Sequence, residues 1–436
     1  MRFSNVSQAR EELNKTSGID ILNKFFDDGS FCETDALLKS GSDFAEAVTG
    51  YGTVMGVPVY AFAQNSDVMS GAMSKAQAKK ISRLYDLAKN TGSPVVGFYD
   101  SCGGRLEQKN DLLASYGEIL GRASAISGVV PQLSVVVGTC LGTSALIAST
   151  ADFLIMTKDA ELSIDVAGDN SSADYNAEHG IANVVCEDKD AAIEKARDLI
   201  TFFPSNNLDV APADDAVAPD FDEECVVCSI ADADSFCDVN EKFGDNACTS
   251  FGRVEGEVVG FVETWGEVID CKSAQKIAKF VRFCDAYSIP VVTVADSKGF
   301  SGIKSAAKVT SAYAEATTAK IAVISGTAVG SVYIALAGES ANADMRFALD
   351  GAVISPVNPK ALAFIMDEEG MKVPVEEQDK AAQAFAQREL TAFNAALCGY
   401  VDDVVDKAQL RAKVSQALQM LSSKRVETLP KKHSTI

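Results

Sequence analysis

The chain has 436 residues, 47% of them hydrophobic and 23% charged, which excludes a disordered chain. Its length suits about two domains of ~200 residues each. The net charge is −22, and such an acidic protein repels a phosphate backbone, so we expect no nucleic-acid partner. The chain has two histidines, His179 and His433, which argues against a histidine-rich metal site and against chemistry needing several imidazole bases. We therefore expect no bound metal.

The N-terminal segment and the cysteines predict a cytoplasmic protein. Residues 1–15 lack the apolar core of a signal peptide, and eleven cysteines in such a chain are expected to be reduced thiols. Cys225 and Cys228 form one CxxC, but the second pair of a zinc ribbon is missing. Val226 and Val227 between them favour a strand, and a metal site is the less favoured alternative.

The predicted elements of the first half alternate between strands and helices. A hairpin is predicted over 50–65, followed by a helix that begins at Ser74, which forms a capping box with Gln77. A β-branched strand over 94–98 leads into a glycine-bearing loop and a second helix. Another strand over 133–137 ends in a glycine turn that opens a third helix. This alternation predicts a largely parallel sheet covered by helices.

The longest apolar stretch, 133–156, is long enough to cross a membrane. Glycines and polar residues interrupt it, among them Gly138, Gly142 and Asp152. We therefore interpret it as a buried strand, a turn, a short helix and a second strand, with a membrane span as the alternative.

The sequence contains an internal repeat, and its two copies define two domains. SPVVGFYDS at 93–101 recurs as IPVVTVADS at 289–297, and VGTCLGTS at 137–144 recurs as SGTAVGSV at 325–332. Blocks further upstream recur in the same order, with offsets that drift as loop insertions would make them. We predict two copies of one α/β domain, 1–215 and 216–436, split near the acidic segment 209–223.

Two loops of the first copy, DSCGGRLEQ at 100–108 and GTCLGTS at 138–144, follow predicted strands, where ligands gather in open α/β sheets. In the first loop, Gly103 and Gly104 let backbone N–H groups approach a ligand without an intervening Cβ atom. The alternative is that both glycines serve only tight turns.

In the second loop, Gly142 and Thr143 stand where a helix begins, so their N–H groups lack intrahelical partners. Two free amides at a helix N-terminus can hold a developing oxyanion. The second copy offers DSKGFSG at 296–302 and GTAVGSV at 326–332, so the same positions occur twice. Two such sites suit an enzyme that moves a group between two carbonyl compounds. The glycine motifs of dinucleotide-binding, P-loop and serine-hydrolase proteins are absent.

These motifs resemble, over nearly the whole chain, the carboxyltransferase subunit of biotin-dependent acyl-CoA carboxylases and sodium-pumping acyl-CoA decarboxylases. The blocks that carry the resemblance are FDDGSFCE at 26–33, DSCGGRLEQ, GTCLGTS, PSNN at 204–207, AYAEAT at 312–317, AVGSVY at 328–333, GYVDDVVD at 399–406 and the closing Lys424, Arg425, Lys432 and His433. Their common order distinguishes this resemblance from chance similarity of single motifs.

The resemblance implies two tandem crotonase-like domains, with acyl-CoA bound by the first and carboxybiotin by the second. The thioester enolate would be held by amides near Gly142 and Thr143. The ureido oxygen of biotin would be held by amides near Gly330, Ser331 and Val332; the adjacent pair that donates is left open in both cases. Cofactor contacts would come from the two other loops, through Gly103, Gly104, Arg105, Gly299 and Phe300.

The resemblance further implies acyl-CoA as substrate, and biotin on a separate biotin carboxyl carrier protein because the chain has no biotinylation motif. It also implies a homo-hexamer built as a dimer of trimers and, on the decarboxylase side, a membrane subunit as a further partner. This sequence departs from the family at Cys102, Thr143 and Ser331, where the family has glycine, and its loop after Gly299 is shorter.

Several alternatives remain open at this stage. Arg105 could meet a CoA phosphate or pair with Glu107 or Asp100, and Lys298 could meet a substrate carboxylate or be solvated. Another crotonase-type CoA enzyme, a hydratase, isomerase or hydrolase, would need a carboxylate base, for which Glu118 is the candidate. A non-catalytic carboxylase-complex subunit is a third possibility. The sequence does not name the acyl chain or the direction of carboxyl transfer.

Overall fold

The structure is a computed structural model that describes residues 5–41, 43–165, 170–431 and 435–436. Lys432 and His433, which contributed to the resemblance at the end of the chain, lie outside the described residues. The chain divides into two compact units, Met1–Pro212 and Ala213–Ile436.

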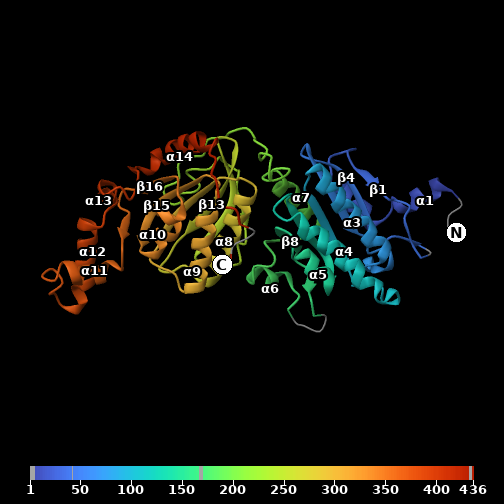
Figure 1. The fold of residues 1–436 in the computed structure, drawn as a ribbon, viewed down its shortest axis with the longest axis horizontal. Coiled ribbons are helices and arrows are strands. Elements are labelled where there is room, and N and C mark those ends of the chain that lie inside the picture. The colour runs from blue at the N-terminus through green and yellow to red at the C-terminus, as the bar shows by residue number, and fades with distance from the viewer. Residues whose placement is uncertain (1–4, 42, 166–169, 432–434) are drawn as a thin grey trace. The chain divides into compact units, whose positions relative to one another are not determined.

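Both units are built from a mixed sheet and the helices that cover it (Figure 1). The first unit contains α1 (Val6–Leu13), α2 (Ser17–Phe25), β1 (Cys32–Thr34), β2 (Lys39–Ser40), β3 (Asp43–Phe44), β4 (Ala47–Val54), β5 (Val57–Gln64), α3 (Lys75–Thr91), β6 (Val95–Ser101), α4 (Asp111–Ala125), β7 (Gln132–Leu141), α5 (Thr143–Ala148), β8 (Phe153–Thr157), β9 (Glu161–Ser163), α6 (Ala173–Glu178), β10 (Val184–Cys186) and α7 (Lys189–Ile200). The second unit contains β11 (Cys237–Val239), β12 (Ala247–Val254), β13 (Glu257–Thr264), α8 (Cys271–Ala286), β14 (Val291–Ser297), α9 (Ile303–Glu315), β15 (Lys320–Val329), α10 (Ser331–Leu336), β16 (Met345–Leu349), β17 (Val353–Ser355), α11 (Pro359–Met366), α12 (Gln378–Glu389), α13 (Ala392–Leu397), β18 (Asp403–Val405) and α14 (Lys407–Leu421).

The two sheets have the same topology. Their strand orders are β1-β4-β5-β6-β7-β8-β10 and β11-β12-β13-β14-β15-β16-β18, with β9 on β7 and β17 on β15. In each sheet the first three strands are antiparallel and all later pairs are parallel. This arrangement confirms the predicted α/β class, the repeat and the hairpin at 50–65.

Helices cover both faces of each sheet. In the first unit, α3, α4 and α5 share one apolar core with the sheet, whereas α2 and α7 contact each other and the sheet outside this core. In the second unit, α8, α9 and α10 are the counterparts on one face, and α14 lies on the other against a core that includes Val226 and Val227. Because both faces are buried, the central strands read as continuous apolar runs rather than alternating ones.

The apolar stretch 133–156 forms β7, α5 and β8, as interpreted from the sequence. Within the described residues, the structure contains no helix of the length and apolar character that crossing a membrane requires.

The capping box predicted at α3 is half formed. Ser74 accepts a hydrogen bond from the Gln77 backbone N–H at 3.1 Å. The Gln77 side chain does not return to Ser74 but donates to the carbonyl oxygens of Glu46 and Gly71. It thereby fixes the start of α3 against β4 instead of completing the cap.

A β-bulge explains the glycine that opens each repeated GT motif. The register between β6 and β7 shifts at Asp100, and that between β14 and β15 shifts at Asp296. Each aspartate lies against the next strand, where a Cβ atom on Gly138 or Gly326 would come within 2.2–2.3 Å of its carboxyl group. Only glycine leaves room for this packing.

An arginine of the last helix fastens the first hairpin in each unit. In the first unit, Arg197 of α7 donates to the Phe25 carbonyl oxygen and, at 3.0 Å, to the Asp27 carboxylate. The same carboxylate accepts from the backbone N–H groups of Met55 and Gly56, each at 3.0 Å. The Asp27 carboxylate thus joins the hairpin to α7. We call this arginine–aspartate pair, with the hairpin N–H groups that it binds, the hairpin clamp.

The second unit repeats this hairpin clamp. Arg411 of α14 donates to the Ile230 carbonyl oxygen and to Asp232 Oδ1 at 2.5 and 2.7 Å. Asp232 accepts from the N–H groups of Glu255 and Gly256 at 3.1 and 2.7 Å. No sequence motif pointed to either clamp.

The units differ at their first segment, and two predictions for this segment are wrong. Where the first unit has α2, the second has turns over 226–230, so Val226 and Val227 are not in a strand. Cys225 and Cys228 form a disulfide, so not every cysteine is a reduced thiol. The CxxC turn places their Cα atoms 5.3 Å apart, within the ordinary range for a disulfide. The second unit also carries α11 and α12, a helix pair that extends from the sheet (Figure 1).

The Asp27 hairpin clamp predicts a specific dependence of stability on pH. Partial burial alone would raise the pKa of Asp27, but hydrogen bonds from Gly56, Thr53, Met55 and Arg197 outweigh it and lower the pKa from 3.8 to about 2. The charged form is therefore favoured by folding, and its stabilisation is complete above pH 4 and lost as the pH falls towards 2.

Asp27→Asn should lower the free energy of unfolding of the first unit by about 1–2 kcal/mol at pH 7. Chemical unfolding followed at several pH values measures this difference, which should stay constant from pH 7 to 5 and shrink below pH 4. A difference that is independent of pH down to pH 2 would show that the Asp27 charge contributes no stability.

Candidate active site

The turn between β7 and α5 presents two free backbone amides. Gly142 adopts φ 65° and ψ −134°, a left-handed conformation that favours glycine. Its N–H donates to the Ser163 carbonyl oxygen of β9 at 2.8 Å, so Gly142 is not a free donor as predicted. The next two residues, Thr143 and Ser144, begin α5, and their N–H groups have no hydrogen-bond partner among the described residues.

The turn between β15 and α10 has the same geometry. Gly330 adopts φ 48° and ψ −107°, and its N–H donates to the Ser355 carbonyl oxygen of β17 at 2.8 Å. This bond removes Gly330 from the predicted donors. The N–H groups of Ser331 and Val332, at the start of α10, have no partner within the part of the chain that the structure describes.

The donor pairs that the geometry supports are therefore Thr143 with Ser144 and Ser331 with Val332. The sequence left the donating pair near Gly142 and Thr143 open, and it did not name the Ser144 amide. Placing the N-cap at the glycine would have identified it, since the first helical N–H groups lack intrahelical acceptors.

The space around the two turns differs. A Cβ atom on Gly142 would meet nothing within 4 Å, whereas one on Gly330 would meet the Pro356 carbonyl oxygen at 2.8 Å. The Thr143 and Ser331 side chains are both exposed, so neither covers its own amide by being buried over it. Ser144 and Val332, which carry the second amide of each pair, are buried.

The loop after β6 is pinned to the segment that precedes α3. Met73 donates to the Gly103 carbonyl oxygen at 2.8 Å, and Arg105 N–H donates to the Met73 carbonyl oxygen at 2.9 Å. Gly103 has φ 120°, and a Cβ atom there would meet no neighbour within 4 Å. Gly104, in contrast, packs beneath the loop against Leu112 and Tyr116 of α4.

The corresponding loop after β14 is pinned in the same way. Ile269 donates to the Gly299 carbonyl oxygen at 2.9 Å, and it pairs with Phe300 in an isolated bridge. A Cβ atom on Gly299 would meet no neighbour within 4 Å. Lys298 forms an ion pair with Glu267, so it is not simply solvated.

Arg105 is bound inside the first unit. Its guanidinium donates to Glu46 Oε1 at 2.8 Å, to the Ser40 hydroxyl at 2.8 Å and to Glu107 Oε1 at 2.6 Å. Glu46 is fully buried and also accepts from Ser40 and Ser74. These contacts favour the ion-pair interpretation of Arg105 over a contact with a CoA phosphate. The Glu46 partner was not foreseen, because it lies in the bend just before β4, far away in sequence.

The side chains of the first unit that could serve acid–base or thiol chemistry have different surroundings. Glu118 lies on the exposed side of α4, two residues beyond the buried Tyr116 that faces Gly104. His179 stacks on Tyr175, with ring centroids 4.0 Å apart. Burial raises the pKa of the Cys140 thiol, and Cys102 is exposed. Within the described ranges, no cluster of metal-ligating side chains is found.

The Arg105–Glu46 pair predicts a cost in stability. Arg105→Gln leaves the buried Glu46 carboxylate without its cationic partner, which should destabilise the first unit by about 3 kcal/mol. The double variant Arg105→Gln, Glu46→Gln removes both charges and should recover part of this loss. Urea unfolding and acyl-CoA titration separate the two interpretations, since unchanged stability with weakened acyl-CoA binding would support the phosphate contact instead.

Comparison with known proteins places this geometry in a family. The Carboxyl transferase domain family matches residues 14–436. Methylmalonyl-CoA decarboxylase subunit alpha of Veillonella parvula is 32% identical over 97% of this chain and 93% of its own length. Methylmalonyl-CoA carboxyltransferase 12S subunit of Propionibacterium freudenreichii subsp. shermanii is 32% identical over 98% of this chain and 92% of its own length.

Solved structures give the same result. The chain matches the transcarboxylase 12S crystal structure, a hexamer with methylmalonyl-coenzyme A bound, with a TM-score of 0.88 and 30% identity over 98% of this chain and 94% of that one. The alignment with the Veillonella subunit spans 478 residues, more than the 436 of this chain, so that relative contains segments that this chain lacks. The chain belongs to the carboxyl transferase family and is a carboxyltransferase of the biotin-dependent acyl-CoA carboxylase type, with two crotonase-like units in tandem.

Proposed function

We propose that the first unit, 1–215, binds the acyl-CoA and that the second unit, 216–436, receives biotin from a separate carrier protein. The observation that carries this proposal is the pair of equivalent turns, each with at least two unpaired amides after a glycine whose own N–H is engaged. Carboxyl transfer develops negative charge on two oxygens, one on each reactant. Two donor pairs meet that requirement without a side-chain nucleophile.

At the first turn, the Thr143 and Ser144 amides would donate to the thioester oxygen. As the α-carbon gains electron density during carboxyl transfer, charge gathers on this oxygen and the enolate forms. Fixed amides stabilise it without reorganisation, and the N-terminus of α5 adds a favourable dipole. Gly142 has a positioning role, because its bond to Ser163 sets the direction of the next two N–H groups.

The donor set of the second turn fits a urea oxygen, which is neutral at rest and accepts two N–H groups in the way a backbone carbonyl does. Biotin, when bound, supplies the ureido nitrogen that carries the carboxyl group. The Ser331 and Val332 amides would hold the ureido oxygen, and Ser355 would orient them through Gly330. Gly103 and Gly299 are the loop positions with open space around them, and we propose that the reactants contact the loops there. Phe300, which follows Gly299, would contact biotin from the same loop.

The named relatives support an acyl group of three to four carbons as the substrate class, since their names specify methylmalonyl-CoA and propionyl-CoA. They are subunits of larger complexes, which supports a biotin carboxyl carrier protein as partner and, from the decarboxylases, a membrane subunit. The hexamer of the transcarboxylase 12S structure supports a hexamer, a dimer of trimers, for this chain as well.

A proline at the first helical position tests the first turn. Thr143→Pro removes one donor, yet proline fits the first turn of a helix, so α5 should form. We expect the carboxyl-exchange rate with free biotin and methylmalonyl-CoA to fall about 100-fold. Thr143→Ala keeps the amide and should retain the rate within a few-fold. Equal activity of all three proteins would contradict the assignment of this amide.

The matching change in the second unit tests which reactant each unit binds. Ser331→Pro should raise KM for free biotin or lower the biotin-dependent rate, and leave acyl-CoA affinity unchanged. Thr143→Pro should leave KM for biotin unchanged. Steady-state kinetics with either reactant varied, together with calorimetric titration of acyl-CoA, separates the two patterns. The reverse pattern would mean that the roles of the units are exchanged.

A further inference from the structure

The segment 222–232 of the second unit occupies the place that helix α2 takes in the first unit. It leads into Asp232 as α2 leads into Asp27, the carboxylates of the two hairpin clamps. The core beneath α14 contains the buried side chains of Val226, Val227 and Ile230. The segment therefore contributes apolar side chains to the core, as a helix would, although it is not helical. We name it the CxxC loop.

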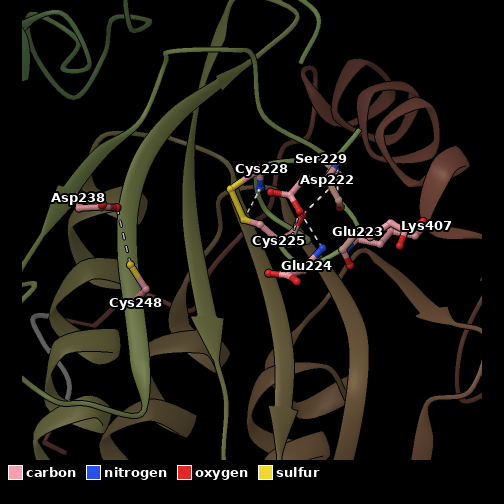
Figure 2. Close-up of a disulfide and its surroundings, with 9 residues drawn as sticks. All are labelled: Asp222, Glu223, Glu224, Cys225, Cys228, Ser229, Asp238, Cys248 and Lys407. Atoms are coloured by element: carbon pink, nitrogen blue, oxygen red, sulfur yellow. Dashed lines mark hydrogen bonds between the residues drawn. A yellow bond between two sulfur atoms is a disulfide. The ribbon is translucent and has the colours of Figure 1, made fainter. Parts of the chain in front are cut away.

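Helix α14 holds the CxxC loop at both ends. Lys407, the first residue of α14, donates to the Glu223 carbonyl oxygen, and Arg411, one turn later, donates to the Ile230 carbonyl oxygen (Figure 2 shows the Lys407 contact). The Cys225–Cys228 disulfide lies between these two anchors. Reduction or oxidation of the two sulfurs therefore affects the mobility of the backbone to which Arg411 of the second hairpin clamp is bound.

The two sulfur atoms have different surroundings. The Cys225 sulfur accepts a hydrogen bond from the Cys228 N–H at 3.1 Å (Figure 2). Cys228 lines an open cavity of about 510 Å³, together with Asp222, Asp232 and Phe236. An incoming thiol can thus reach Cys228, and the amide stabilises negative charge on Cys225.

We propose that Cys225 and Cys228 are a reversible thiol–disulfide exchange site, open to small uncharged thiols, whose oxidised form holds the CxxC loop against α14. The acidic cavity lining, with Asp220, Asp222 and Asp234, disfavours anionic thiols such as glutathione and favours neutral ones. This site lies apart from both amide turns and does not depend on the proposed function.

In the reducing direction, a thiolate attacks the Cys228 sulfur, the bond between the sulfurs breaks, and Cys225 leaves as a thiolate and takes up a proton. A second thiol of the reductant then attacks its own sulfur in the mixed disulfide, releasing Cys228 and a small cyclic disulfide. Two electrons and two protons pass from the dithiol to the protein. Oxidation by the cyclic disulfide follows the reverse course.

Single-cysteine variants of the full chain test the assigned attack site. The probe is bis(2-hydroxyethyl) disulfide, a linear uncharged disulfide, followed by mass mapping of the cysteine peptides under non-reducing conditions. Cys225→Ser should form a mixed disulfide at Cys228 about ten times faster than Cys228→Ser forms one at Cys225. The exposed free thiols Cys32 and Cys271 give the background rate in each digest. Equal rates in the two variants, or rates below this background, would overturn the proposal.

Hydrogen exchange tests the link to the hairpin clamp. Reducing the full chain with dithiothreitol should speed amide exchange about tenfold in the CxxC loop and the first turn of α14. Helices α2 and α7, the counterparts in the first unit, should not change, because no cysteine lies in them. The double variant Cys225→Ser, Cys228→Ser should match the reduced protein under both conditions. Exchange that is the same with and without reductant, or that rises equally in both units, would overturn it.

Discussion

Each candidate site depends on one glycine. Its own N–H is hydrogen-bonded to a strand of the sheet, whereas the N–H groups of the next two residues are not. Gly142 and Gly330 adopt left-handed conformations, and each donates to a serine carbonyl oxygen on the short neighbouring strand. This bond fixes the direction in which the helix starts, so the following amides are held open rather than left flexible. A donor pair that is fixed before a ligand arrives stabilises developing charge without the cost of reorienting. Both turns meet this requirement through backbone alone, which is why the side chains that follow can differ.

The order of elements and the repeat could be predicted because they rest on local patterns. Apolar runs, glycine turns and recurring blocks are visible along the chain, and they gave the α/β class, the hairpin and the turn-to-helix step at Gly142. The donating pair of amides was left open, because the N–H of Gly142 is engaged by Ser163 of β9, and the pairing of β9 with β7 is not visible locally. The role of Arg105 was left open for the same reason, because its partner Glu46 lies in a distant segment, just before β4. The strand expected at Val226 and Val227 was wrong, because two valines indicate that a segment is buried but do not indicate its backbone conformation.

Duplication has left the two units with a shared frame and different attachments. Three features recur at equivalent places: the bulges at Asp100 and Asp296, the loops bonded to the segment before the next helix, and the hairpin clamps. In each of them, close contact between backbone groups limits which residues the position accepts. The differences lie where one element can replace another without altering the sheet, as with α2 and the CxxC loop, or where an element is added, as with α11 and α12. Chemistry at the two turns can therefore diverge while the frame stays the same.

The hairpin clamps also set the order in which the chain can acquire its structure during synthesis. Each clamp joins the first hairpin of a unit to the last helix of that unit, so neither hairpin is fastened until that helix has been made. The first unit can close once α7 leaves the ribosome, while the second unit is still being translated. The hairpin of the second unit must wait for α14, with its apolar face uncovered over a long stretch of elongation. The wait is similar in the two units, since the clamped residues lie 170 positions apart in the first and 179 in the second, so each unit passes through a stage of synthesis in which association with other chains is a hazard.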